Sequence, residues 1–239
     1  IFKAMKGTLA FIKLLFVIVL AGVLFGFARQ RNNTRKISHI DVKFTDENNP
    51  FITLTAVNKL LIQNSDSVTS IPKETLVLKE MEERLLNNPM VRDAQVFITI
   101  DGGLGAKIEQ RNPIARVVGS NHFYIDEDGK KMPLSSVYSA RVPLITGSSK
   151  TDFTELTPLL LKLKNDTFMK QIVSGLHKNK NGTVELILRK EGFKVQFGDL
   201  EHIDKKIQNF KAFYQKAKKD KRLSAYNLVD LQFGSQVVA

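Results

Sequence analysis

The sequence predicts an α+β protein with one transmembrane helix, a small β-α-α-β-β domain and a larger strand-rich domain with flanking helices. Three observations support this. An apolar run of 21 residues lies near the N-terminus, a strand-helix-helix-strand-strand order follows, and a series of short strands separated by Pro- or Gly-rich turns comes last. We expect residues 1–36 to form the tail, helix and linker, 37–111 the small domain, and 112–239 the strand-rich domain.

The apolar run Thr8–Ala28 has the length and composition of a membrane-spanning helix. Its single charge, Lys13, lies near its start, from where the side chain can reach the headgroups. A cleaved signal peptide and a buried core helix are the alternatives. The run is long for a signal peptide, however, and FGFARQ is not a small-residue cleavage site. We therefore expect an uncleaved, single-pass anchor.

The net charge of +12 is concentrated around this run. Seven of the 36 Lys and Arg residues, and no acid, lie within residues 1–36, which leaves a net charge of +5 for the rest. The high charge is therefore no sign of nucleic-acid binding. Basic residues flank both ends of the run, so charge alone leaves the orientation open. The absence of cysteine fits both a reducing and an oxidising compartment.

The small domain is predicted to start with a strand and two helices. Ile40, Val42 and Phe44 alternate as in a half-buried strand, and we expect them to be core or edge residues. A short helix is expected in FITLTAVNKLLIQNSDS. A stronger one, KETLVLKEMEERLLNN, follows Pro72 and ends before Pro89.

Two strands complete the small domain. They are VRDAQVFITI and LGAKIEQR, joined by Asp101-Gly102-Gly103, which is a hairpin signal.

Short strands dominate the second region. The candidates are ARVVG, HFYID, GKKMP, VPLITG, TVELILR, FKVQF and the closing YNLVDLQFGSQVV. TELTPLLLKLKNDTFMKQI is predicted as one helix. EHIDKKIQNFKAFYQKAKK is a second, and its apolar stripe consists of Ile203, Ile207, Phe210, Tyr214 and Ala217.

The acidic stretch Asp126-Glu127-Asp128-Gly129 raises the possibility of a calcium loop. Such a loop needs a bidentate Glu six residues after the glycine, where this sequence has Ser135. Strand patterns, not helices, flank it. Asp-Gly between alternating strands predicts a type I′ hairpin turn instead.

Other signals of chemistry are equally weak. Ser70-Ile71-Pro72-Lys73 matches the S-x-x-K of penicillin-binding enzymes, but the accompanying S-D-N and K-T-G motifs are missing. The four histidines form no metal-binding pattern. The basic residues of the helix Lys205–Lys219 are interpreted as a solvent-exposed polar face opposite its apolar stripe, rather than as a nucleic-acid or lipid site. We expect no catalytic, cofactor-binding or metal-binding residues.

Several short motifs occur in a characteristic order behind the anchor. They are Asn88-Pro89-Met90-Val91, the stretch Glu109–Ala115, Tyr124-Ile125-Asp126 with Gly129 and Pro133, Val142–Gly147, Val195–Gly198 and Tyr226–Phe233. In this order they resemble the FtsQ/DivIB family of bacterial cell-division proteins.

The resemblance implies a non-enzymatic role. Members of this family are single-pass proteins of the cytoplasmic (inner) membrane, with the N-terminus in the cytoplasm and a POTRA domain and a β domain in the periplasm. They act at the division septum as scaffolds of the divisome, linking early division proteins to FtsB/FtsL-type coiled-coil partners and to septal peptidoglycan synthesis. The POTRA domain is implied to be a second docking surface.

The resemblance also implies a partner site at the last strand, Val229–Val237, where the partner adds its own strand. The corresponding residues are Tyr226, Leu228, Asp230, Gln232, Phe233, Ser235 and Val237, with Lys205, Lys211 and Lys216 on the preceding helix. Gln232 and Phe233 replace an Arg-Tyr pair of the family.

Two other functions compete with this interpretation. A POTRA-bearing chaperone or assembly factor for outer-membrane proteins would carry several POTRA repeats and a β-barrel, and neither pattern is found. An anchored cell-wall enzyme would need a nucleophile or a metal set, and the sequence offers no convincing one.

Overall fold

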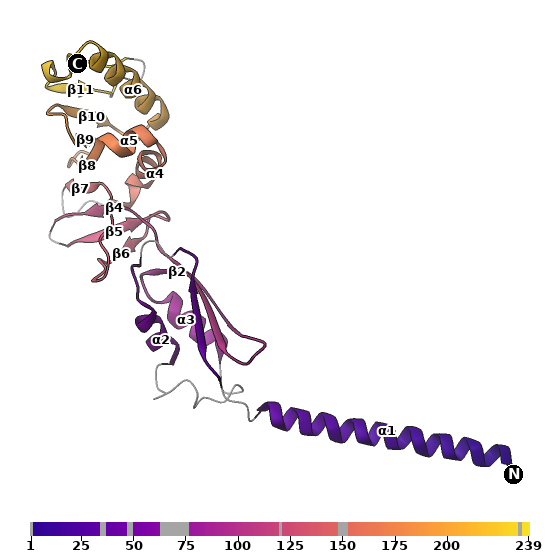
Figure 1. The fold of residues 1–239 in the computed structure, drawn as a ribbon. Coiled ribbons are helices and arrows are strands. Elements are labelled where there is room, and N and C mark those ends of the chain that lie inside the picture. The colour runs from indigo at the N-terminus through magenta and orange to yellow at the C-terminus, as the bar shows by residue number, and fades with distance from the viewer. Residues whose placement is uncertain are drawn as a thin grey trace. The chain divides into compact units, whose positions relative to one another are not determined.

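The computed structural model describes residues 2–33, 37–46, 50–62, 77–119, 121–147, 153–233 and 236–239 (Figure 1). The chain divides into two compact units. Unit 1 consists of Ile1–Thr45, Leu54–Asn88 and Asp93–Ile108, and unit 2 of Asp46–Thr53, Pro89–Arg92 and Glu109–Ala239.

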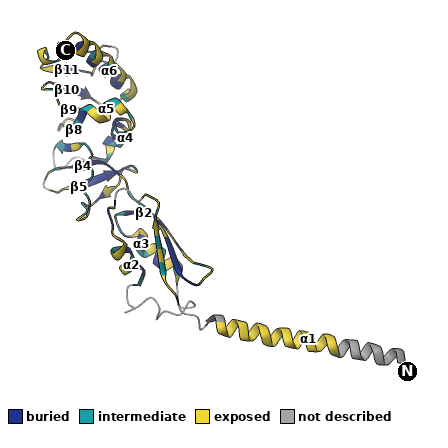
Figure 2. Cartoon of the chain, in the orientation of Figure 1, coloured by how far each residue is buried: buried dark blue, intermediate teal, exposed yellow. Residues whose placement is uncertain are grey.

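The chain begins with the helix α1, Phe2–Asn33. Every side chain described on it, from Lys13 to Arg31, is exposed, and this part of the α1 ribbon is yellow in Figure 2. Among the described residues, this is the one helix that is long and apolar enough to cross a membrane. Its length and composition fit the predicted anchor.

Besides α1, the described part of unit 1 contains a three-stranded sheet and two helices. The strands are β1 (Ile40–Phe44), β2 (Val91–Ile98) and β3 (Leu104–Gln110), in the order β1-β3-β2, and the helices are α2 (Leu54–Ile62) and α3 (Leu78–Leu86). The β-α-α-β-β order predicted from the sequence is confirmed.

The core of unit 1 lies between these helices and one face of the sheet. Met81 and Leu85 of α3 are buried, and so are Leu104, Ala106 and Ile108 of β3. The half-buried β1 residues lie beside that row, because β1 runs parallel to β3 with Ile40 opposite Leu104. Their expected place at the edge of the core is confirmed. The Ser70–Lys73 motif lies outside the described residues.

The described part of unit 2 is built on an eight-stranded sheet in the order β11-β10-β9-β8-β7-β4-β5-β6. The strands are β4 (Pro113–Val117), β5 (Phe123–Asp126), β6 (Lys131–Met132), β7 (Leu144–Gly147), β8 (Val173–Lys178), β9 (Val184–Leu188), β10 (Lys194–Gly198) and β11 (Leu228–Asp230). The sequence interpretation missed β8, because this strand begins directly after a helix ends, without a Pro or Gly between them.

The helices of unit 2 supply the other side of its core. They are η3 (Thr154–Leu156), α4 (Thr157–Asn165), α5 (Thr167–Ile172), α6 (Ile203–Lys219) and η4 (Leu223–Ala225). The single helix predicted before β8 is wrong. Asp166 has an extended conformation and its carboxylate accepts the backbone N–H groups of Phe168 and Met169, both at 3.0 Å, which starts a new helix.

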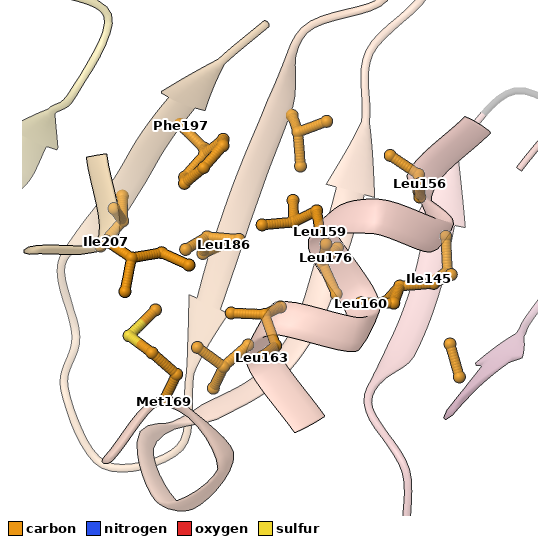
Figure 3. Close-up of a cluster of buried hydrophobic side chains, with 14 of the residues drawn as sticks. Ile145, Leu156, Leu159, Leu160, Leu163, Met169, Leu176, Leu186, Phe197 and Ile207 are labelled. Carbon is orange, nitrogen blue, oxygen red and sulfur yellow. The ribbon is translucent and has the colours of Figure 1, made fainter. Parts of the chain in front are cut away.

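One apolar cluster joins these helices to the sheet. Figure 3 shows Leu159 and Leu163 of α4 pointing at Leu176 and Leu186 of the central strands, beside Phe197. The predicted stripe of α6 is confirmed in its main part, because Ile207, Phe210, Tyr214 and Ala217 are buried. This core holds α6, β10 and β11 together at one end of the sheet.

Candidate partner-docking edge

The strand β11 is one of the two edges of the described eight-stranded sheet. It is parallel to β10, with Val229 opposite Val195. The N–H of Lys194 donates to the carbonyl of Asn227 (3.0 Å), and the N–H of Leu231 donates to the carbonyl of Gln196 (2.9 Å). Val229 and Leu231 are buried, 0% and 2% exposed. The inner side of β11 is therefore firmly attached to unit 2.

The outer side of β11 is partly occupied by the chain itself. The N–H of Asp230 donates to the carbonyl of Val238 (2.7 Å), and the N–H of Val238 donates to the carbonyl of Asp230 (3.1 Å). Backbone groups of successive residues in an extended segment point to alternate sides. From this alternation we expect the N–H groups of Val237 and Ala239 to be directed away from β11, with the segment around Val238 on the outer side of this edge.

The predicted strand Val229–Val237 is thus too long, because β11 ends at Asp230. The carboxylate of Asp230 accepts the N–H of Gln232 at 2.8 Å, a side-chain turn that competes with continued pairing. The side chain of Gln232 then packs against Gly198, where an added Cβ would lie 2.6 Å from the Gln232 Cγ atom.

The predicted contact residues differ in their exposure. Leu228 and Phe233 are 45% and 51% exposed, as is expected of docking residues. Tyr226 is half-buried, with its ring 5.0 Å from that of Phe213, and Val237 packs partly against the core. Ser235 lies outside the described residues.

Val238 is a surface residue of this edge that the sequence interpretation missed. The residue is 47% exposed, and its backbone pairs with that of Asp230. The reversal of the chain between the two residues hid this role.

The three predicted contact lysines of α6 also differ. Lys205 and Lys216 are exposed, whereas the Nζ of Lys211 lies 2.5 Å from Asp166 and above the ring of Phe168. Although partial burial opposes it, the hydrogen bond from Lys211, with those from the backbone, keeps the pKa of Asp166 below its ordinary value. Lys211 therefore secures the start of α5, and Lys205 and Lys216 are the lysines open to a partner.

The acidic stretch Asp126–Asp128 forms ion pairs with several other segments of unit 2. Asp126 is 1% exposed and lies 2.6 Å from Arg111. Glu127 pairs with Lys164 at 2.5 Å, and Asp128 pairs with Arg92 at 2.9 Å. Each of the three acids therefore has a basic partner. Among the residues that the structure describes, no group of three or more His, Cys, Asp and Glu side chains could hold a metal ion.

The hairpin predicted at this stretch is confirmed, since β5 pairs with β6 in antiparallel fashion. Its turn is not type I′, however, because in the described loop Glu127–Lys130 only Gly129 has a positive φ, 73°. Type I′ needs positive φ at both central residues. The carboxylate of Asp126 instead accepts the N–H groups of Asp128 and Lys130 and shapes the loop from inside.

Comparison with known proteins agrees with this architecture. The family model described as FtsQ/DivIB, C-terminal related, matches residues 112–239, more than half of the chain. The chain belongs to the FtsQ/DivIB family. A model described as a POTRA-like domain matches residues 35–109, so the predicted POTRA-type domain is confirmed.

A curated member of the FtsQ/DivIB family can be aligned with this chain. The cell division protein FtsQ of Geotalea daltonii is 24% identical over 176 residues, which cover 68% of this chain and 63% of that protein. The chain thus spans less than two thirds of the length of this relative. The FtsQ/DivIB family is a family of non-enzymatic cell-division proteins.

Proposed function

We propose that the protein is a membrane-anchored, non-enzymatic scaffold of the bacterial divisome. In this proposal α1 crosses the inner membrane once, with the N-terminus in the cytoplasm and both following domains in the periplasm at the septum. The boundaries follow the sequence, with the POTRA-type domain at 37–111 and the β domain at 112–239. The protein connects early division proteins to FtsB/FtsL-type coiled-coil partners and thereby to septal peptidoglycan synthesis.

The partner is proposed to add a strand to the edge formed by β11 and residues 236–239. One observation carries this proposal. The backbone N–H and C=O groups of Asp230 are paired with those of Val238, and strand alternation leads us to expect the N–H groups of Val237 and Ala239 to face away from the sheet. A partner strand gains a ladder of hydrogen bonds there. Leu228, Phe233 and Val238, each about half exposed, supply the apolar contacts.

The basic residues of α6 are proposed to add electrostatic attraction. Lys205 and Lys216 are exposed near the two ends of α6. Exposed lysines increase the association rate of an acidic partner more than they increase its affinity. Lys211 is assigned a smaller role, since Asp166 already pairs with it.

The test is co-purification from native membranes of full-length protein with single substitutions at Val237. Val237→Pro removes the outward N–H, whereas Val237→Ala keeps it and removes most of the side chain. We expect Val237→Pro to lose a single-pass coiled-coil partner pair and Val237→Ala to retain it. Equal retention by both variants, or recovery of outer-membrane precursors, would overturn the proposal.

Point substitutions are preferable to truncation before β11. Such a truncation removes Val229 and Leu231, which are buried in the core of unit 2. Loss of a partner could then reflect loss of the fold. A thermal melt of each Val237 variant, followed by circular dichroism, checks that unit 2 remains folded.

A further inference from the structure

The turn between β2 and β3 exposes an isoleucine completely. Ile100 has a relative exposure of 108%. The turn is closed by the N–H of Thr99 donating to the carbonyl of Gly103 and the N–H of Gly102 donating to the carbonyl of Thr99, both at 2.9 Å. Turn positions of this kind favour polar residues, Gly and Pro. The turn therefore gives no local reason for an isoleucine.

Two more exposed apolar residues precede this turn on β2, on opposite faces of the sheet, and we call Phe97, Ile98 and Ile100 the apolar tip. Phe97 and Ile98 are 46% and 39% exposed. The Phe97 ring lies against Gly105, where an added Cβ would be 2.3 Å from the ring, so the backbone of β3 supports it from below. Single exposed apolar residues are ordinary, but three of them at and beside one turn indicate a binding surface.

The apolar tip lies at the end of unit 1 that is joined to the anchor. The N–H of Ser38 donates to the carbonyl of Gly102 (3.3 Å), and the N–H of Leu104 donates to the carbonyl of His39 (2.9 Å). α1 ends at Asn33. The five residues from there to Ser38 can span at most about 18 Å. Chain connectivity alone therefore keeps the turn within reach of the bilayer surface.

We propose that the apolar tip inserts into the interface of the bilayer that α1 crosses, and so fixes the orientation of the POTRA-type domain on the membrane. Apolar side chains gain free energy on leaving water for the interface. The tether makes this contact intramolecular, so a small surface is sufficient. Arg29 and Arg31, at the end of α1, are exposed and suit anionic headgroups.

A protein strand added to β2 is a less suitable occupant. The backbone N–H of Val96 already donates to the Glu82 carboxylate of α3 at 2.8 Å. A carboxylate that occupies an edge N–H blocks the ladder that an incoming strand would form. The lipid surface needs no such ladder. The inference depends on the anchor and not on any division partner.

The test uses the full chain in nanodiscs of phosphatidylethanolamine and phosphatidylglycerol that contain a lipid with a doxyl quencher. The sequence has no cysteine, so single cysteines can be labelled with a fluorophore without interference. Asp101→Cys places the label at the tip, and Asp93→Cys places it toward the other end of β2. We expect quenching to be several-fold stronger for the label at position 101.

A second substitution distinguishes insertion of the apolar tip into the bilayer from its mere proximity to the bilayer. Ile100→Ser, combined with the label at position 101, is expected to abolish most of the quenching. Leu54→Ser is the matched control, because Leu54 is 52% exposed and lies outside the tip. Equal quenching at positions 101 and 93, or quenching insensitive to Ile100→Ser, would overturn the proposal. Shielding of the label in native membranes but not in nanodiscs would assign the tip to a protein and would also overturn it.

Discussion

The side chain of Gln232 lies directly against Gly198, whose φ of 80° lies in the left-handed region. Gly198 is the last residue of β10, and Gln232 follows β11. This contact holds the chain against the end of β10 just after it leaves β11. The geometry of the candidate edge thus depends on a glycine outside it.

Gly198→Ala is expected to destabilise unit 2 by about 1–3 kcal/mol, because a Cβ is strained at positive φ and clashes with Gln232. Thermal unfolding of the two proteins measures the difference. Gly192→Ala is the control, since a Cβ there meets nothing within 4 Å and its φ is not in the left-handed region. Equal losses of stability for the two variants would contradict the claim that Gly198 is required by its positive φ and its contact with Gln232.

Asp166→Ala removes the cap that starts α5 and the partner of Lys211. We expect a loss of about 1–2 kcal/mol in the free energy of unfolding. Lys162→Ala removes an exposed ion pair with Asp204 and is expected to cost less than about 1 kcal/mol. Chemical denaturation measures both, and a larger loss for Lys162→Ala would contradict this account.

The pKa of Asp166 also predicts a pH dependence. Because this pKa is lower in the folded state, the stabilisation is present above the ordinary value of about 3.9 and is lost as the pH falls through the folded-state value. Asp166→Asn keeps a capping oxygen but removes the charge. Its stability deficit relative to the unmodified protein should therefore shrink as the pH is lowered below about 4. A deficit that grows on acidification would refute this explanation.

Arg111→Met is expected to destabilise unit 2 strongly, by about 3 kcal/mol, because it leaves the buried Asp126 carboxylate without its cation. Arg92→Met breaks a more exposed pair with Asp128, in which the Arg92 side chain is 41% exposed, and should cost about 1 kcal/mol or less. Calorimetric melts of the two variants provide the comparison. Similar losses of stability in the two variants would show that the buried Asp126 carboxylate does not need Arg111 as its ion-pair partner.

The fold was predictable where the local pattern and the packing agree. The apolar stripe with Ile207, Phe210 and Tyr214 identified α6, and Asp101-Gly102-Gly103 identified the β2–β3 hairpin. Prediction failed where one side chain decides the backbone path. Asp166 divides a continuous helical pattern, and Asp230 ends β11 before its alternating pattern ends.

The candidate edge was predictable only in part. A closing strand was predicted where β11 lies, but whether Phe233 faces solvent was left open, and the pairing of Val238 with Asp230 depends on a chain reversal that no local pattern specifies. A change of one residue in register exchanges inward and outward groups, so alternation in the sequence alone could not identify the outward backbone groups.

The central claim, that the partner adds a strand at the edge of residues 236–239, is tested most directly by site-specific photo-crosslinking in dividing cells. A photoreactive amino acid is placed at Val237 and, as the matched position, at Lys131 on the opposite edge strand β6. The account predicts cross-links from position 237 to a single-pass coiled-coil membrane protein and none to that protein from position 131. Cross-links to it from position 131 but not from position 237 would contradict the claim.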